Sequence, residues 1–319
     1  MRPRTCVRAS LIGLCAVLLV PSAAVAQLPG RGVPAKEKTG SELVKLDAYA
    51  VADEIRAPGK TMLAVRFRIE PKWHIYWKNP GESGTRPEIR ITGPEGLAVG
   101  KILWPRPVVF KTAWETTYGY ANDVTLLVPV ELDRSADAPV VLTIEAEWLV
   151  CKEMCLFGSG RTTLELAPRD APITKGTHAK AFAAARARLP RDLAAVPGAQ
   201  VRLSMPKGDE PPILTLIGPM GDATTATFVP DLTPGVEVGG GLPVAATIAD
   251  GVFTLELPLQ VEPDNALDGR LAVAGVVLLG NRATDPSFEI RMPLESLGAT
   301  GANPDTPVKK PTSGASNRP

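Results

Sequence analysis

Residues 145–160 read EAEWLVCKEMCLFGSG. Their first four positions alternate between polar and apolar side chains and two more apolar residues follow, a pattern that is typical of a half-buried β-strand. A second alternating run, RTTLEL, follows at residues 161–166. Cys151 and Cys155 therefore lie at a turn between two predicted strands. A bridge between them requires that the turn bring their Cα atoms within about 7 Å.

Short alternating runs recur along the rest of the chain, separated by Pro, Gly, Asn and Asp. They occupy residues 64–69, 124–130, 140–150, 201–204, 213–217, 226–229, 252–261, 271–279 and 288–292. This spacing is typical of β-sandwiches. Residues 177–189 differ, because alanines and basic residues of good helix propensity dominate there. We therefore predict two sandwiches joined by a short helix that Pro190 ends or kinks.

The N-terminus has the three parts of a secretory signal peptide. Three arginines among the first eight residues precede the apolar run 11–20, and residues 24–26 read AVA. A membrane-spanning helix needs about 20 apolar residues, and this run has about half of that number. We predict cleavage after Ala26 and export to the periplasm.

The same composition shifts predict the domain boundaries. Residues 1–26 are the predicted signal peptide, 27–40 a flexible lead-in, 41–170 a first sandwich with the cysteine pair, 171–198 a helical connector, 199–297 a second sandwich, and 298–319 a disordered tail.

Charge and composition exclude several classes of function. The 319 residues carry a formal charge of +1, and loss of the three N-terminal arginines turns this into −2. Binding to nucleic acid requires a basic surplus that this chain lacks, so we predict no nucleic-acid partner. No later segment has 18 uninterrupted apolar residues, so the mature chain is expected not to span a membrane. No carboxylate pair, Ser/His/Asp set or phosphate-binding loop stands out, and we predict no cofactor.

The spacing of the cysteine pair leaves several roles open. Cleavage after Ala26 leaves Cys151 and Cys155 as the two cysteines in an oxidising compartment, where paired thiols form disulfides. A bridge that closes a five-residue loop stabilises a fold by only about 2 kcal/mol, against about 4.7 for a 100-residue loop. A neighbouring cation such as Lys152 would lower the pKa of an exposed thiol. Redox exchange, a structural staple and metal binding all remain possible from spacing alone.

Four separated blocks surround this pair: WHIYWKNPGESG at 73–84, WPRP at 104–107, YGY at 118–120 and WLVCKEMC at 148–155. Together they resemble the N-terminal periplasmic domain of the DsbD and ScsB thiol:disulfide interchange proteins, also known as a disulphide bond corrector domain. The resemblance runs from about Ser41 to Ala167 and implies an immunoglobulin-like sandwich. The predicted fold class is all-β, with two immunoglobulin-like β-sandwiches joined by a short helical connector.

The resemblance also implies an activity, that of a thiol:disulfide oxidoreductase of the protein-disulfide reductase type. Cys151 and Cys155 would be the redox pair, with Cys155 entering the mixed disulfide. The implied partners are a membrane electron-donor protein and periplasmic proteins that contain disulfides. The chain shows no membrane or thioredoxin-like domain, so its reductant is expected to be another polypeptide.

Aromatic residues are the candidates for supporting roles near the pair. In one branch of the family, a loop that ends in Tyr-Gly carries an aromatic cap over the cysteines. Tyr118-Gly119 matches that end, but Thr117 replaces the capping Phe. The other candidates form sandwich core or a collar around the disulfide, and with Lys152 and Tyr118 the supporting set comprises Trp73, Tyr76, Trp77 and Trp148.

His74 leaves a second function open. It is either a core or turn histidine, or it polarises a thiol. With Met154 and the two cysteine sulfurs it could also bind Cu(I), which prefers soft thiolate and thioether ligands, and ScsB-like proteins are associated with copper tolerance. The alternative function is thus a copper-binding or protein-binding module whose disulfide is structural.

Overall fold

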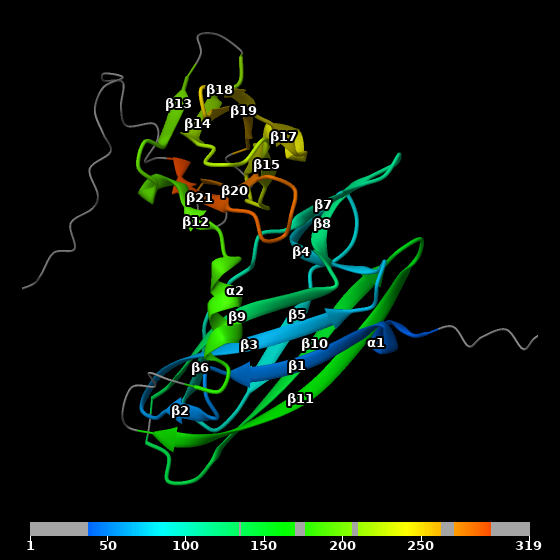
Figure 1. Ribbon diagram of the computed structural model, residues 1–319, viewed down its shortest axis with the longest axis vertical. Helices are drawn as coiled ribbons and strands as arrows, with labels where there is room; N and C mark the ends of the chain where they lie inside the picture. Colours follow the sequence, from blue (N-terminus) through cyan, green and yellow to red (C-terminus); the bar gives the residue numbers. More distant parts are fainter. Residues whose placement is uncertain (1–37, 134, 170–175, 206–209, 263–270, 295–319) are drawn as a thin grey trace, which may run out of the picture. The chain divides into compact units, whose positions relative to one another are not determined.

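The computed structural model describes residues 38–133, 135–169, 176–205, 210–262 and 271–294. The described chain is built from two β-sandwiches and two short α-helices (Figure 1). The predicted signal peptide, the predicted tail 298–319 and residues 27–37 of the predicted lead-in lie outside the described residues.

The first sandwich consists of a four-stranded and a seven-stranded sheet. The smaller sheet has the order β1-β3-β9-β6, with bounds Val44–Ala50, Gly59–Ile69, Asp123–Leu132 and Leu97–Val99. The larger has the order β2-β11-β10-β4-β8-β7, with β5 also paired to β10. Its bounds are Glu54–Arg56, Cys155–Arg169, Val140–Cys151, His74–Gly81, Thr116–Ala121, Val108–Lys111 and, for β5, Glu88–Thr92.

Strand β10 shows why these sequences form a sandwich. Its even-numbered residues, from Val140 to Val150, are all buried, while most of the odd-numbered ones are more exposed. Because side chains alternate across a strand, the even set faces the other sheet. Cys151, an odd-numbered residue, therefore lies on the outer face of the seven-stranded sheet.

Two short α-helices pack on this sandwich. Helix α1, Gly40–Leu43, begins with a capping box between Thr39 and Glu42. Helix α2, Ala179–Ala187, lies across the four-stranded sheet (Figure 1) and buries Phe182 against Ala64 and Leu127.

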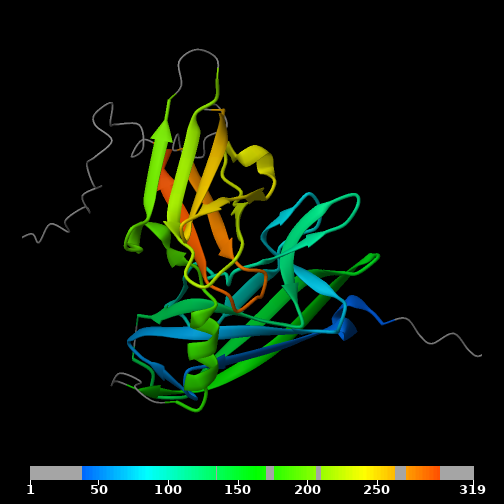
Figure 2. The ribbon, with the colours of Figure 1, turned by 45° about the horizontal axis from the view of Figure 1, so that its top comes forward.

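The second sandwich pairs two five-stranded sheets (Figure 2). The first has the order β12-β21-β20-β15-β17, with bounds Arg191–Asp192, Ser287–Pro293, Ala272–Leu279, Ala226–Pro230 and Val244–Ala245. The other has the order β13-β14-β19-β16 with β18 on β19, and its bounds are Gln200–Ser204, Ile213–Pro219, Val252–Val261, Val236–Val238 and Thr247–Ala249. Two 3-10 turns, η1 at Leu193–Ala195 and η2 at Gly239–Gly241, complete it.

The predicted fold class, all-β with two sandwiches and a short helix between them, is confirmed. The alternating runs coincide closely with β3, β9, β10, β11, β13, β14, β15, β19, β20 and β21, and the alanine-rich run with α2. Among the described residues, no helix is long and apolar enough to cross a membrane.

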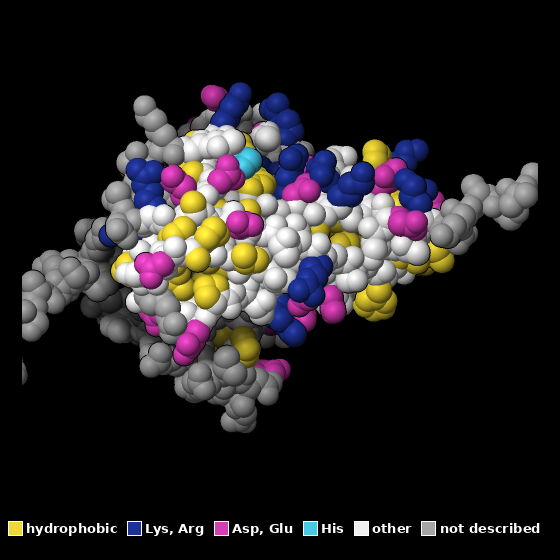
Figure 3. All heavy atoms as spheres, turned by 90° about the horizontal axis from the view of Figure 1, so that it is seen from below, with side chains coloured by type: hydrophobic (Ala, Val, Ile, Leu, Met, Phe, Trp, Pro, Cys, Tyr) yellow, Lys and Arg dark blue, Asp and Glu magenta, His cyan; other side chains and the backbone are white. Residues whose placement is uncertain are grey.

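Charged side chains of both signs are mixed on the surface. On the face shown in Figure 3, lysines and arginines lie beside aspartates and glutamates, with apolar side chains between them. The ion pairs Arg66–Asp123, Arg68–Asp47 and Arg161–Glu145 are examples of this mixing. Both signs of charge are thus present on that face, in agreement with the formal net charge of +1.

Candidate functional site

The β10–β11 hairpin brings the two cysteines together. Its ladder runs from Val140 opposite Leu166 to Cys151 opposite Cys155, which form the last pair before the turn. The two sulfurs form a disulfide with a Cα–Cα distance of 4.1 Å. Cys151 is 3% exposed, whereas Cys155 is an exposed residue. One end of the bridge is therefore accessible to a partner and the other is covered.

Strand β4 provides the cover over Cys151. Its first residue, His74, is paired with Cys151 in the sheet. Because side chains alternate, His74 and Tyr76 lie on the same face as Cys151. The Tyr76 hydroxyl donates to Cys151 Sγ at 3.0 Å, and the same oxygen is 3.6 Å from Cys155 Sγ. A buried hydroxyl donor thus contacts the bridge.

The loop that follows β4 fixes the ring of Tyr76. Gly84 has a φ of 96°, and a Cβ at this position would overlap the Tyr76 ring. Only glycine allows the backbone to approach the ring this closely. Burial raises the pKa of Tyr76, the side chain of Ser83 in the same loop opposes this shift, and Glu115 adds to it, so the phenol keeps its proton at neutral pH.

His74 lies in an aromatic cluster on the same face. Its ring stacks on Phe110 of β7, with centroids 4.4 Å apart, and meets Tyr76 edge-on at 5.3 Å. Strand β8 lies between β4 and β7, and Gly119, opposite Tyr76, has no side chain to separate the rings. Burial lowers the pKa of His74 below its usual 6.5, although Glu115 opposes the shift. His74 is therefore neutral at pH 7.

Most of the other predicted supporting residues lie elsewhere. Trp77 and Tyr118 meet edge-to-face in the core, and Trp148 packs edge-to-face on Phe67 there. Burial raises the pKa of Tyr118 to about 12. Trp73 is half-buried against the same core. Lys152 pairs with its neighbour Glu153 at 3.4 Å. Among the described contacts, Tyr76 is the member of the predicted set that reaches a cysteine sulfur.

Two phenylalanines of this region were missed by sequence reasoning. Phe110 stacks on His74, although Thr117 replaces the Phe expected before Tyr118-Gly119. Phe157 is 85% exposed and lies two positions after Cys155, on the same face of β11. Met154, in the turn itself, is 60% exposed. The alternation of β11 was the signal that could have identified Phe157 as a neighbour of the disulfide.

The predicted Cu(I) set consists of Cys151, Cys155, Met154 and His74. Both sulfurs of the cysteines are joined in the disulfide. Within the part of the chain that the structure describes, no three His, Cys, Asp or Glu side chains are grouped so as to hold a metal ion.

Comparisons with known proteins agree with this geometry. Residues 41–167 match the family model of the N-terminal part of thiol:disulfide interchange protein DsbD. The N-terminal periplasmic domain of ScsB from Proteus mirabilis has a similar fold, with a TM-score of 0.55 and 19% identity, over 81% of this chain and 95% of that one. The major pilin subunit BcpA of Bacillus cereus aligns with 79% of this chain and 66% of its own, at 9% identity and a TM-score of 0.26, which is too low to support an argument.

No curated protein matches the sequence. The family model covers the first sandwich, whereas the similarity to the ScsB fold extends over both sandwiches. Residues 41–167 of this chain therefore match the N-terminal domain family of the DsbD thiol:disulfide interchange proteins.

Proposed function

We propose that this chain exchanges a dithiol for a disulfide through Cys151 and Cys155 in the periplasm. The observation that carries the proposal is the asymmetry of the bridge: Cys155 is exposed, while Cys151 is buried beneath the Tyr76 hydroxyl. The match of residues 41–167 to the DsbD N-terminal family supports the same chemistry.

The exposed sulfur is the one that a donor attacks. A thiolate of a reduced partner attacks Cys155 Sγ, the bond to Cys151 Sγ breaks, and Cys151 leaves as a thiolate. The partner is then joined to Cys155 in a mixed disulfide. The partner's second thiolate attacks its own sulfur in that bond, which leaves the partner oxidised and both cysteines of this chain reduced.

The second half of the cycle uses the same sulfur. The Cys155 thiolate attacks the disulfide of an oxidised acceptor and forms a mixed disulfide, while one acceptor sulfur leaves as a thiolate. Cys151 then attacks Cys155 Sγ, which restores the bridge and releases the acceptor with both its sulfurs reduced. Two electrons pass from donor to acceptor, and water supplies the protons that the acceptor thiolates take up.

Tyr76 favours the reduced state in this scheme. A hydrogen bond to a charged group contributes about 1.5 to 3 kcal/mol, roughly twice the value for neutral partners. The bond from Tyr76 should therefore be stronger when Cys151 is a thiolate than when it is part of the disulfide. His74 is neutral at pH 7 and adds no positive charge.

The surroundings of Cys155 suit a transient protein partner. Met154 and Phe157 expose apolar surface beside the attacked sulfur. Exposed apolar side chains of this kind are commonly covered when a partner docks. The proposed donor is a membrane protein with a dithiol, and the proposed acceptors are periplasmic proteins with disulfides.

Glutathione disulfide tests the assignment of roles directly. Reduced Cys151→Ala should form a mixed disulfide with glutathione on Cys155 at least tenfold faster than reduced Cys155→Ala does on Cys151, as followed by mass spectrometry. In the chain from Gln27 onward, which lacks Cys6 and Cys15, the double variant should form none. Equal rates for the two single variants would contradict the assignment of roles, and no adduct on either would contradict the proposed function.

A further inference from the structure

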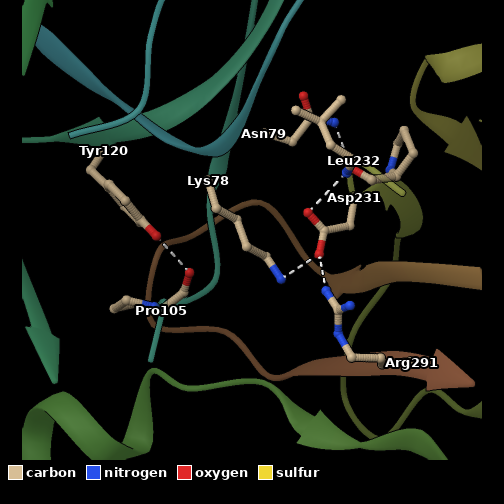
Figure 4. A network of polar contacts seen from close by, with 8 residues as sticks. Lys78, Asn79, Pro105, Tyr120, Asp231, Leu232 and Arg291 are labelled. Atoms are coloured by element: carbon tan, nitrogen blue, oxygen red, sulfur yellow. Dashed lines mark hydrogen bonds and ion pairs between the residues drawn. The ribbon is translucent and has the colours of Figure 1, made fainter. Parts of the chain in front are cut away.

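Strand β4 contacts both the disulfide and the second sandwich. Its pairing with β8 is regular as far as Tyr76 opposite Gly119, and the register then shifts before Gly81 pairs with Thr117. Lys78 and Asn79 lie within this irregular segment. Figure 4 shows both residues beside the segment of the second sandwich that contains Asp231. Lys78, which contacts the second sandwich, is therefore only two positions along β4 from Tyr76, the donor to Cys151.

Both polar atoms of the Asn79 side-chain amide make hydrogen bonds. Asn79 is 4% exposed, its Nδ2 donates to the Pro230 carbonyl at 2.8 Å, and its Oδ1 accepts from the Gly81 amide at 3.0 Å. The loop with Ser83 and Gly84, which holds the Tyr76 ring, begins directly after this anchor. The second sandwich thus fixes the start of the loop that positions the phenol.

Lys78 supplies a second anchor. Its Nζ lies 2.7 Å from Asp231 Oδ2, and Arg291 approaches the same carboxylate at 2.6 Å (Figure 4). The Asp231 side chain is 5% exposed and the Lys78 side chain 21%. Ion pairs that are shielded from water are screened little and hold their geometry better than exposed pairs. Lys78 and Arg291 thus hold one carboxylate from two different sandwiches.

Contacts beside β4 hold the same two sandwiches together. The Tyr120 hydroxyl on β8 donates to the Pro105 carbonyl at 2.8 Å. The next residue, Arg106, is 2% exposed and donates to four carbonyls of the second sandwich, those of Leu279, Gly280, Asp285 and Pro286. Three apolar residues of the second sandwich are packed into the core of the first: Val229, Val276 and Leu278. These contacts therefore help to keep the second sandwich in place beside Lys78 and Asn79 of β4.

We propose that the second sandwich sets the reduction potential of the Cys151–Cys155 pair, by holding β4 through Lys78 and Asn79 so that Tyr76 donates to Cys151. Lys78 and Asn79 are positioning residues in this scheme, because neither contacts a sulfur. The inference rests on the proposed function, and it gives the second sandwich a role in it.

The hydrogen bond from Tyr76 to Cys151 determines in which direction the reduction potential should change. If Tyr76 is less well placed, the Cys151 thiolate loses more stabilisation than the disulfide does. Loss of the Lys78 contact should therefore disfavour the reduced pair. We expect Lys78→Gln to lower the equilibrium constant for reduction by glutathione about threefold, and Lys78→Arg, which keeps the cation, to preserve it.

Arg291→Gln provides the matched control. Both Lys78→Gln and Arg291→Gln remove one cation from Asp231 and leave the other cation in place, but only Lys78 lies on β4. Each full-length variant is equilibrated with glutathione, with and without Tyr76→Phe, and the oxidised fraction is measured. A double-mutant cycle then shows whether the effect of Lys78 passes through Tyr76.

We expect the equilibrium constant for reduction to fall threefold in Lys78→Gln and to stay unchanged in Arg291→Gln. In the Tyr76→Phe background, Lys78→Gln should have no further effect on this constant. Equal effects of the two variants, no effect of Lys78→Gln, or an effect that persists without the Tyr76 hydroxyl would overturn the inference. A wild-type pair that stays oxidised at every ratio of reduced to oxidised glutathione would instead contradict the proposed function, because structural disulfides resist reduction by glutathione.

Discussion

The Tyr76 hydroxyl donates a hydrogen bond to the sulfur of Cys151 at 3.0 Å, although the two residues are 75 positions apart in the chain. The contact exists because β4 pairs with the end of β10, so that His74 lies opposite Cys151 and Tyr76 follows on the same face. A donor at this sulfur favours the thiolate over the disulfide.

Tyr76→Phe should make the pair harder to reduce. The hydrogen bond is stronger to the thiolate than to the disulfide, and a difference of about 1.4 kcal/mol lowers the equilibrium constant for reduction about tenfold, which is about 30 mV for a two-electron couple. The matched control is Tyr118→Phe, because Tyr118 is equally buried but faces the core, and its hydroxyl has no hydrogen-bond partner among the described residues. A potential that changes in Tyr118→Phe as much as in Tyr76→Phe would show that the hydroxyl contact is not the cause.

His74 should contribute to stability in a pH-dependent way. Burial lowers its pKa in the folded state, so the folded protein binds fewer protons on His74 than the unfolded chain does. Its contribution is therefore fully present above the unfolded pKa of about 6.5 and is lost as the pH falls below that value. Urea unfolding at pH 7.5 and pH 5.5 measures how much free energy of unfolding is lost on acidification. This loss should be smaller in His74→Gln than in wild type. An unchanged loss would show that His74 does not titrate in this way.

The first sandwich should depend on helix α2 for part of its stability. Phe182 is 3% exposed and packs against Ala64 and Leu127 of the four-stranded sheet. Phe182→Ala should destabilise the protein by about 3 to 5 kcal/mol, since it leaves a cavity and removes a buried ring. Thermal melts measure this loss of stability. Lys180→Ala, at an exposed position of the same helix, is the control. A melting temperature of Phe182→Ala equal to that of the control would contradict the packing role of α2.

Arg106 should not be replaceable by lysine. Its guanidinium donates to four carbonyls from two NH2 groups, an arrangement that one ammonium cannot reproduce. Burial lowers its pKa to about 10, and it stays charged at neutral pH. Arg106→Lys and Arg106→Met should both lower the free energy of unfolding by at least about 2 kcal/mol, as measured by urea denaturation. Wild-type stability in Arg106→Lys would show that charge alone is sufficient.

Period-two alternation accounts for what the sequence could predict. It identified most of the longer strands, and it also determines which aromatic residues can reach the cysteines, although sequence reasoning left open which of them form the core and which a collar. In the stretch 73–84, His74 and Tyr76 share the cysteine face, while Trp77 faces the core. Residue spacing alone therefore could not assign these side chains without the pairing of β4 and β10.

Other parts of the site depend on long-range pairing that no local pattern contains. The stacking of Phe110 on His74 requires β7, β8 and β4 to be neighbours. The bond from Asn79 to Pro230 joins residues 151 positions apart. Asn79 belongs to the 73–84 block that carries the family resemblance, but its partner in the second sandwich lies outside the range of any local pattern.

The reduction potential of the Cys151–Cys155 pair tests the central claim most directly. The full chain is equilibrated with defined ratios of reduced and oxidised glutathione, and the fraction of disulfide is measured by thiol alkylation and mass spectrometry. A pair that exchanges electrons with protein partners should have a potential above about −300 mV. A potential well below that value would identify the bridge as a structural disulfide and contradict the account.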